Sequence, residues 1–409
     1  MRWGCFLRYA TFLARVEPRD HGPVRTAPPT TAPPAAALTD DVVSAGRAAG
    51  LDAVGVAPAE PFESTRVDLE RRRDEGLHGG MAFTYRNPAR STDPGRIVDG
   101  ARAIVVGARG YLADGHDDER HPAAGRVARY AWSDHYDALR RSLGAVAEVL
   151  VEAGYRAKVV ADDNALVDRE AAHRAGLGWY GKNANLLLPG HGSWFVLGSV
   201  VTDAPLRPSA APVADGCGSC TRCLDGCPTG AIVAPGIVDA RRCLAWLVQA
   251  PGSFPVEHRL ALGDRIYGCD DCQEVCPPNR RAARIGDPVA ATDDEGEPWV
   301  DLVDLLAAGD DELLDRHGRW YIARRDPVHL RRNALVALGN VGDAADARVV
   351  DAVATALEHP HPLVREHAVW AARQLGLDDL LAQVAAVESD PQVRAELERP
   401  STGGGVDGP

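Results

Sequence analysis

The chain has 409 residues, of which 45% are hydrophobic and 25% charged, which is ordinary for a soluble globular protein of several domains. Its net charge of −13 argues against a protein whose whole surface binds nucleic acid without specificity. No apolar run approaches the length of a membrane span and no export signal is recognisable, so we expect a cytoplasmic protein without membrane contact.

The first two segments differ sharply in pattern. Residues 1–38 end in a Pro/Ala/Thr-rich stretch that predicts a disordered extension. In residues 39–205, helical and strand patterns alternate, which is typical of an α/β domain. The helices are expected near 40–49, 62–75, 136–153 and 165–175, and the strands near 53–56, 103–106, 157–160 and 193–201.

Residues 206–285 form a cysteine-rich segment. Its first run has the spacing C-x2-C-x2-C-x3-C-P, which is the bacterial ferredoxin signature, and a second, stretched set follows. In that signature three thiolates hold one cubane and the fourth crosses to the other. Applied here, the rule assigns one 4Fe–4S cluster to Cys217, Cys220, Cys223 and Cys276, and the second to Cys227, Cys243, Cys269 and Cys272.

Structural zinc and disulfide bonds fit these cysteines less well than iron–sulfur clusters do. Structural zinc prefers two separated pairs of ligands, whereas three thiolates spaced C-x2-C-x2-C fit one cubane better. A disulfide framework belongs to short secreted chains. We therefore expect a ferredoxin-like module that carries two 4Fe–4S clusters.

A helical array is expected at the C-terminal end. After a connecting segment at 286–325, the sequences "DPVHLRRNALVALGNVGD" and "HPLVREHAVWAARQLGLDD" share a proline start, arginines and an apolar face that ends in Leu-Gly. This repetition predicts HEAT-like helical repeats over residues 326–400. Residues 401–409 are expected to be a flexible tail.

The α/β domain contains a candidate catalytic group and a candidate ligand loop. Asp162 follows a predicted strand, where open α/β sheets place ligands, although one of Asp162, Asp163 and Asn164 is expected to cap the next helix. The glycine-rich loop "AGLGWYGKN" lets backbone approach a bulky ligand, but such loops also serve as plain turns. It contains the candidates Gly178, Trp179, Lys182 and Asn183.

Two upstream segments add polar candidates. Arg90, in "GGMAFTYRNPARSTDP", is suited to clamp an anionic or amide group, although a solvated arginine is the ordinary case. The segment "RYAWSDHYDALRR" offers Arg129 and Asp134 just before a helix, where Asp134 is equally suited to be the N-cap.

A basic run with aromatic residues precedes the repeats. The sequence "RHGRWYIARRDPVHLRR" has few acidic residues and suits phosphate contacts on an otherwise acidic protein, while a solvated helix face is the alternative. The candidate tRNA-contacting residues in it are Arg319, Arg324, Arg325, Arg331 and Arg332.

Together these segments resemble the epoxyqueuosine reductase family, over about nine-tenths of the chain. The segments quoted above, with "GSWFVLGSVVTD", "CGSCTRCLDGCPTGAIV" and "RIYGCDDCQEVCPPNR", carry the resemblance. The segment "WSDHY" departs from the family's more usual Gly-x-Asp-Tyr-His. The resemblance implies an oxidoreductase that reduces the epoxide of epoxyqueuosine at the tRNA wobble position to queuosine, the last step of queuosine biosynthesis.

The resemblance also implies cofactors, partners and roles. It implies a cobalamin in the α/β domain, Asp162 as proton donor, tRNA as substrate and an external low-potential electron donor, and we expect a monomer. No Asp-x-His-x-x-Gly motif occurs, so we expect cobalamin binding without a histidine below the cobalt. The expected cobalamin contacts are Arg90, Arg129, Asp134, Asp162, Gly178, Trp179, Lys182 and Asn183.

Two other functions remain open at this point. A reductive dehalogenase pairs a similar cobalamin domain with two clusters, but it typically has a twin-arginine signal and no helical repeats. A non-catalytic electron carrier would need only the cysteine module and the repeats. The large α/β domain with Asp162 argues against the carrier.

Overall fold

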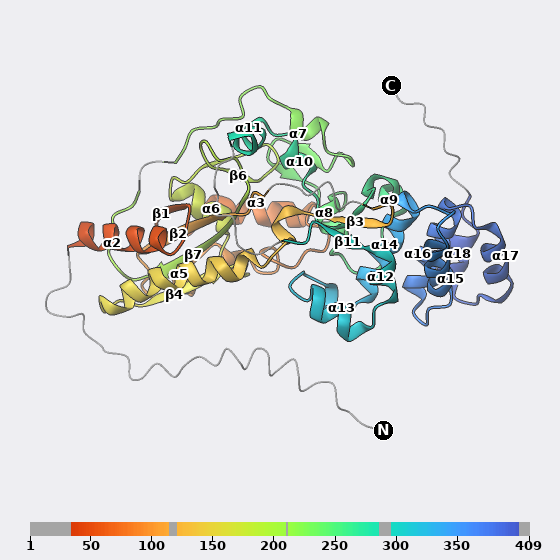
Figure 1. Ribbon diagram of the computed structural model, residues 1–409. Coiled ribbons are helices and arrows are strands. Elements are labelled where there is room, and N and C mark those ends of the chain that lie inside the picture. The colour runs from red at the N-terminus through yellow and green to blue at the C-terminus, as the bar shows by residue number, and fades with distance from the viewer. Residues whose placement is uncertain (1–33, 114–120, 210–211, 286–295, 401–409) are drawn as a thin grey trace.

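The structure, a computed structural model, describes residues 34–113, 121–209, 212–285 and 296–400. Most of the predicted N-terminal extension and the predicted C-terminal tail lie outside these ranges. The molecule is elongated, with the α/β part at one end, the helical repeats at the other, and the cysteine module beside their junction (Figure 1). None of the described helices is both long and apolar enough to cross a membrane.

The α/β part is built on a four-stranded sheet of order β1-β2-β7-β4. Its strands are β1 (Ala53–Pro58), β2 (Ala103–Gly110), β7 (Phe195–Thr202) and β4 (Ala157–Ala161). All three pairings are antiparallel. The expected alternation of helices and strands is present, but the argument from the strand ends of an open α/β sheet does not apply, because neighbouring strands of this sheet run in opposite directions.

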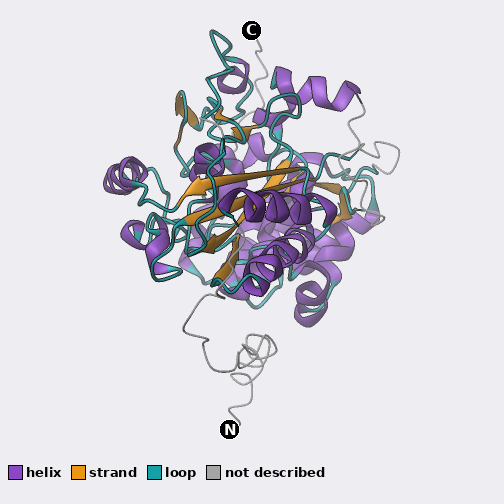
Figure 2. Cartoon of the chain, turned by 90° about the vertical axis from the view of Figure 1, so that its left-hand side faces the viewer, coloured by secondary structure: helices purple, strands orange, loops and turns teal. Residues whose placement is uncertain are grey.

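Helices cover both faces of this sheet, as Figure 2 shows. Helices α2 (Ala35–Ala48) and α5 (His135–Glu152) pack with the side chains of Val105 and Val200 on one face, while Ile104 and Val106 pack on the other with α6 (Asp168–Arg174). Successive side chains of a strand point to opposite faces, and both faces of β2 are therefore apolar.

The predicted start of the ordered chain is four residues too late. Helix α2 begins at Ala35, inside the segment expected to be disordered, and Leu38 is buried against the sheet. The alanines that gave this segment its low-complexity composition are also good helix formers. Helix α3 (Glu63–Asp74) and two short helices, α4 (Pro88–Ser91) and η1 (Pro94–Arg96), connect β1 to β2.

A second, three-stranded sheet joins distant parts of the chain, and the sequence did not predict it. Strand β3 (Ala124–Val127) lies between β10 (Arg265–Tyr267), which is parallel to it, and β11 (Trp299–Asp301), which is antiparallel. Strands of three or four residues carry too little periodicity to be found from sequence. Their residues belong to one core that continues into the helical repeats.

The cysteine module consists of short elements. They are α7 (Arg222–Asp225), the hairpin β8 (Ile232–Ala234) and β9 (Ile237–Val238), α8 (Leu244–Leu247), α9 (Val256–Leu262), α10 (Asp271–Glu274) and α11 (Pro277–Ile285). Helices α8 and α9 and strand β10 occupy the stretch between Cys243 and Cys269. This insertion explains why the second set of cysteines is stretched.

The C-terminal region is helical throughout its described part. Two helices, α12 (Leu302–Ala307) and α13 (Asp310–His317), and the turn η4 (Ala323–Arg325) precede the repeats. The repeat helices are α14 (Val328–Val341), α15 (Ala347–Leu357), α16 (Pro362–Gln374), α17 (Asp378–Val387) and α18 (Pro391–Leu397). Helix α14 is buried along nearly its whole length, which has consequences for its arginines.

Candidate functional site

Cys217, Cys220, Cys223 and Cys276 form one group of interacting cysteines. Burial raises the pKa of Cys276 to about 11, and the thiols whose charges raise it further are those of Cys217, Cys223 and Cys220. Burial likewise raises the pKa of Cys223, and again the neighbours are Cys217 and Cys220. Cys276 therefore lies with the first three cysteines and not with its own neighbours in sequence.

The other four cysteines form a second, more deeply placed group. Burial raises the pKa of Cys272 well above its usual range, with further contributions from the charges of Cys269, Cys243 and Cys227. Burial also raises the pKa of Cys269 to about 12. Thiols in such surroundings stay protonated without a metal, so a bound cationic group is needed to hold them as thiolates. The two groups thus suit clusters that are bound through ionised sulfur.

Two N–H donors lie close to the cysteine groups. The backbone N–H of Ala231 donates to Sγ of Cys227 at 3.2 Å, an interaction of the kind that tunes iron–sulfur potentials. The indole of Trp179 packs against Gly216, next to Cys217, and its buried N–H has no hydrogen-bond partner in the described part of the chain. It is an available donor for a group held there.

Lys182 and Asn183 tie the glycine-rich loop to the cysteine module. The ammonium of Lys182 donates to the carbonyl oxygens of Gly218 at 2.8 Å and Cys220 at 2.9 Å, and Nδ2 of Asn183 donates to the carbonyl of Cys272 at 3.2 Å. These two residues, expected to contact cobalamin, therefore contact both cysteine groups through backbone. A positive charge at this place favours the reduced, more negative form of a cluster.

Asp162 directly follows β4 and lies in the left-handed region at φ 53°. Its side chain is exposed, yet partial desolvation by the surrounding protein raises its pKa, the charge of Asp163 adds to this, and Arg140 opposes it. Asp163 makes the local turn contact, since its carboxylate accepts from the N–H of Ala165 at 2.8 Å. The expectation that one of Asp162, Asp163 and Asn164 caps the next helix is wrong, because the N-cap of α6 is Val167 and no side chain caps it.

A second carboxyl, Asp168, lies beside Asp162 and was missed from sequence. Burial raises the pKa of Asp168 well above its usual range, and the charge of Asp162 raises it further. The backbone N–H of Asp162 donates a hydrogen bond to Asp168, which opposes this rise. The sequence could have indicated this second carboxyl, because Asp168 lies only six residues after Asp162 and begins the next helix, α6.

The charges of these carboxyls affect the pKa values of two tyrosines, Tyr136 and Tyr267. Burial is the main reason why the pKa of Tyr136 is raised, and the charges of Asp162 and Asp168 raise it further. Burial raises the pKa of Tyr267 to about 12, and Asp162 contributes there as well. These phenols stay protonated at neutral pH, so Asp162 faces neutral donors and not a competing base.

Three other expected cobalamin contacts are Arg90, Asp134 and Gly178. Arg90 is exposed on α4, and α4 reaches the Asp162 loop because the carbonyl of Ser91 accepts from the N–H of Val167 at 3.0 Å. Asp134 is exposed and caps α5 by accepting from the N–H of Asp137 at 2.9 Å. A Cβ at position 178 would lie 2.1 Å from the carbonyl oxygen of Leu187.

That close approach belongs to the hairpin of β5 (Trp179–Tyr180) and β6 (Leu186–Leu187). Strand pairing therefore already explains the glycine at position 178. Asp162, Arg90 and Asp134 are all exposed, and α4 is bonded to the loop that follows Asp162.

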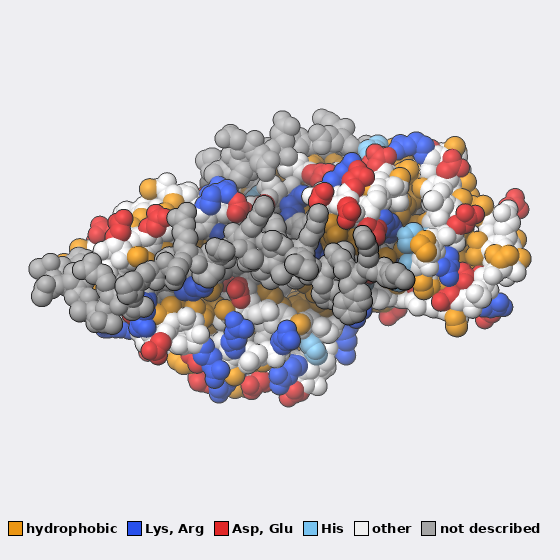
Figure 3. Space-filling model, turned by 90° about the horizontal axis from the view of Figure 1, so that it is seen from below, with side chains coloured by type: hydrophobic (Ala, Val, Ile, Leu, Met, Phe, Trp, Pro, Cys, Tyr) orange, Lys and Arg blue, Asp and Glu red, His pale blue; other side chains and the backbone are white. Residues whose placement is uncertain are grey.

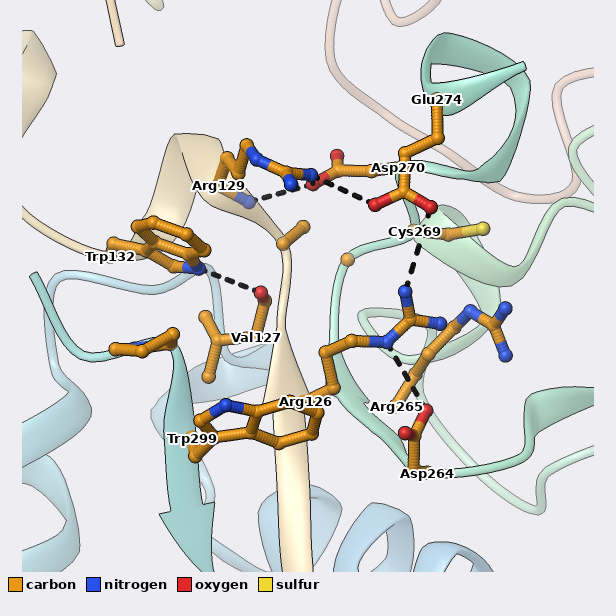
Figure 4. Close-up of a pocket in the computed structure, with 13 residues that line it drawn as sticks. Arg126, Val127, Arg129, Trp132, Asp264, Arg265, Cys269, Asp270, Glu274 and Trp299 are labelled. Atoms are coloured by element: carbon orange, nitrogen blue, oxygen red, sulfur yellow. Dashed lines mark hydrogen bonds and ion pairs between the residues drawn. The ribbon is translucent and has the colours of Figure 1, made fainter. Parts of the chain in front are cut away.

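Arg129 is committed to acidic partners in a neighbouring pocket of about 250 Å³ (Figure 4). Its Nη1 donates to Glu274 at 2.8 Å, and its backbone N–H donates to Asp270 at 2.8 Å. Burial raises the pKa of Asp270 to about 6, while Arg129 lowers it. The pocket also reaches Cys269. Arg129 thus joins β3 to the loop of the second cysteine group and, in this arrangement, its guanidinium does not point to a separate ligand.

The five candidate arginines of the basic run differ in burial: two are buried and three are exposed. Arg332 is fully buried, and its guanidinium donates to the carbonyl oxygens of Ala250 and Gly252, both at 2.6 Å. Arg331 is 6% exposed and donates to Asp310 at 2.6 Å. The prediction that these two residues contact tRNA is wrong, because α14 is a core helix and its arginines bind the protein itself.

The first part of the run remains at the surface. Arg319, Arg324 and Arg325 are exposed, although Arg319 also donates to the carbonyl oxygens of Ala131 and Trp132, both at 3.2 Å. On the face drawn in Figure 3, basic and acidic side chains are interspersed over the described surface. Of the five candidate tRNA-contacting arginines, three are therefore exposed.

Comparison with known families supports three parts of this description. Residues 91–163 match the family model "Epoxyqueuosine reductase QueG, DUF1730", residues 216–279 match a 4Fe–4S double cluster binding domain, and residues 320–399 match HEAT repeats. The expectation of a double-cluster module followed by HEAT repeats is confirmed at this level.

Relatives match nearly the whole chain. An epoxyqueuosine reductase of Bacillus anthracis is 32% identical over 371 residues, which cover 88% of this chain and 96% of the relative. A crystal structure of epoxyqueuosine reductase with an epoxyqueuosine-modified tRNA-Tyr stem loop superposes with a TM-score of 0.80 at 31% identity, covering 88% and 97% of the two chains.

A structure of the Bacillus subtilis enzyme matches equally well, with a TM-score of 0.80 at 30% identity and the same coverage. It is described with a catalytic aspartate loop swung out of the active site.

Proposed function

Because the chain belongs to the epoxyqueuosine reductase family, we propose that it reduces the epoxide of epoxyqueuosine at the tRNA wobble position to queuosine. The reaction takes up two electrons and two protons and releases the epoxide oxygen as water. The observation that carries the proposal is the position of Asp162. Its carboxyl has a raised pKa, and the glycine-rich loop that follows α6 in the same domain is bonded to both cysteine groups.

We assign the electron supply to the eight cysteines. One 4Fe–4S cluster is held by Cys217, Cys220, Cys223 and Cys276, and the other by Cys227, Cys243, Cys269 and Cys272. The mutual charges of the thiols within each group support this crossed assignment. Clusters of this kind pass on one electron at a time, and an external low-potential donor reduces them.

Asp162 acts as the proton donor. Opening an epoxide leaves an alkoxide, which needs a proton, and a carboxyl whose pKa is raised supplies one near neutral pH. The loop that carries Asp162 is held by Asp163 and Asp168, and the catalytic aspartate loop that swings in the Bacillus subtilis relative suggests that this loop moves as well.

A cobalamin is assigned to the open surface that carries Asp162, Arg90 and Asp134. When bound there it supplies a reduced cobalt, which acts as nucleophile or electron donor. A ligand of that size would cover the exposed Asp162, exclude water from it and raise its pKa further. We further propose that the enzyme acts in the cytoplasm as a monomer on tRNA whose wobble base is splayed into the site.

Turnover of tRNA tests the proposal. Protein purified without oxygen, reconstituted with iron, sulfide and cobalamin and supplied with a strong reductant, should convert epoxyqueuosine in tRNA to queuosine, seen by mass spectrometry of the digested nucleosides. An organohalide is offered in parallel. Release of halide with unchanged tRNA would establish the dehalogenase instead, and absence of bound cobalamin with no turnover would leave an electron carrier.

A further inference from the structure

Tyr321 is the exposed member of an otherwise buried aromatic segment. Its side chain is 56% exposed, whereas its neighbours Trp320 and Ile322 are 3% and 5% exposed. A single exposed aromatic residue is ordinary by itself. Its surroundings, however, connect it to the second cysteine group on one side and to unpaired basic groups on the other.

The connection to the second cysteine group runs through Tyr267. The backbone N–H of Tyr321 donates to the hydroxyl of Tyr267 at 2.7 Å, and Tyr267 in turn stacks on Trp320, with ring centroids 4.6 Å apart and planes 9° from parallel. Tyr267 ends strand β10, two residues before Cys269 of the second cysteine group. The backbone of Tyr321 is therefore fixed to an aromatic stack close to the second cysteine group, while its ring is left exposed.

The connection to the basic groups runs through a strained turn. Arg324 and Arg325 are both exposed and both left-handed, at φ 55° and 52°. Two consecutive arginines in this region cost of order 1 kcal/mol or more each, and such strain concentrates at functional sites. Arg325 is anchored by a bond from Nη1 to the carbonyl of Gly318 at 3.1 Å, while Arg324 has no hydrogen bond or ion pair among the described residues.

We propose that Tyr321 is a stacking platform for a nucleotide next to the wobble base, with Arg324 and Arg325 contacting the adjoining phosphates. This inference rests on the proposed function. A base that is splayed into an active site leaves its neighbours with unstacked faces, and proteins cover such faces with aromatic side chains flanked by arginines. A partner protein would fit less well, because the exposed surface consists of one ring among cations.

The test compares Tyr321→Ala with Tyr321→Phe, which keeps the ring and loses only the hydroxyl. Because the ring is exposed, both variants should fold and bind iron like the wild type. Base stacking is worth about 1–3 kcal/mol, so Tyr321→Ala should weaken binding of a synthetic anticodon stem–loop RNA about 5- to 100-fold. Tyr321→Phe should bind normally, as should Val387→Ala, a control at an exposed residue (82%) of α17.

Two further readouts separate stacking from charge. For Tyr321→Ala the slope of affinity against salt should stay unchanged, whereas for Arg324→Ala it should fall by about one. A 2-aminopurine next to the wobble position should be quenched on binding to the wild type and less so on binding to Tyr321→Ala.

If the wild type converts the RNA but Tyr321→Ala binds it equally well and quenches the probe equally, the platform is disproved and the proposed function stands. If the wild type neither binds nor converts the RNA, the proposed function itself fails.

Discussion

The eight cysteines and the five arginines of the basic run were both predicted from residue type and spacing, but the structure treats them differently. The cysteines form two groups of four, and Cys276 crosses to the first three. The arginines separate into exposed and buried members only six residues apart, with Arg325 at the surface and Arg331 in the core. Ligand spacing encodes local geometry directly, whereas a cluster of charges does not encode which side of a helix is covered.

The largest expected effect comes from removing a cysteine of the deeper group. Cys272→Ser should lose about half of the bound iron and all detectable turnover, because a cluster with three thiolates is no longer held. Iron analysis and absorption spectra measure the loss. Cys5→Ser is the matched control, since that cysteine stands far from the module in sequence. Full iron content in Cys272→Ser would contradict the assignment of Cys272 as a cluster ligand.

Asp162→Asn should leave iron content unchanged and lower turnover by about 10²- to 10⁴-fold, the usual contribution of a positioned general acid. Asp163→Asn removes the same charge one residue away, keeps an oxygen that accepts from the N–H of Ala165, and should leave turnover near the wild-type rate. In the wild type the raised pKa keeps Asp162 protonated to higher pH, so turnover should fall as pH rises through that pKa. Near-normal rates for Asp162→Asn would assign the acid elsewhere.

Arg332→Met sharpens the contrast between the arginines. It leaves the buried carbonyls of Ala250 and Gly252 without their donor, so the free energy of unfolding should fall by about 3 kcal/mol in denaturant titrations. Arg324→Met removes an exposed side chain and should change stability by less than about 0.5 kcal/mol. Equal stability of the two variants would contradict the division of the run by burial.

The exposed arginines should matter for RNA and not for folding. The double variant Arg324→Glu, Arg325→Glu should weaken stem–loop binding about tenfold or more at low salt, and the difference should shrink as salt is added. Arg348→Glu, at another exposed arginine on α15, serves as a control with a single charge reversal. Unchanged affinity of the double variant would move the RNA surface away from η4.

The smallest effect concerns Asp168. Its folded pKa is raised by burial, so the folded state holds its proton more tightly than the unfolded state, and stability is lost as pH rises through the folded pKa. Asp168→Asn removes this loss. The variant should therefore gain melting temperature relative to the wild type at pH 8 and gain little at pH 4. An identical difference at both pH values would mean that Asp168 does not titrate in this range.

Much of the fold was predictable because long helices and strands repeat their apolar residues regularly. Strand β7 and helix α5 lie within two residues of the predicted bounds. The three-residue strands β10 and β11 were not predictable, since their pairing depends on distant residues.

In the site, the cysteines and Asp162 stood out by motif, while Asp168 and Tyr267 gain their importance only through burial beside Asp162. For Gly178 and Lys182 the sequence identified the loop but not its partners, which are strand β6 and the cysteine module.

The most direct test of the account is a single turnover without external reductant. Protein loaded with iron–sulfur clusters and cobalamin is reduced, freed of reductant and mixed with tRNA that contains epoxyqueuosine. Two clusters that each give one electron supply the two electrons of the reaction, so the account predicts about one queuosine per protein as the cluster absorbance returns to the oxidised form. Clusters that stay reduced while epoxyqueuosine remains intact would contradict it.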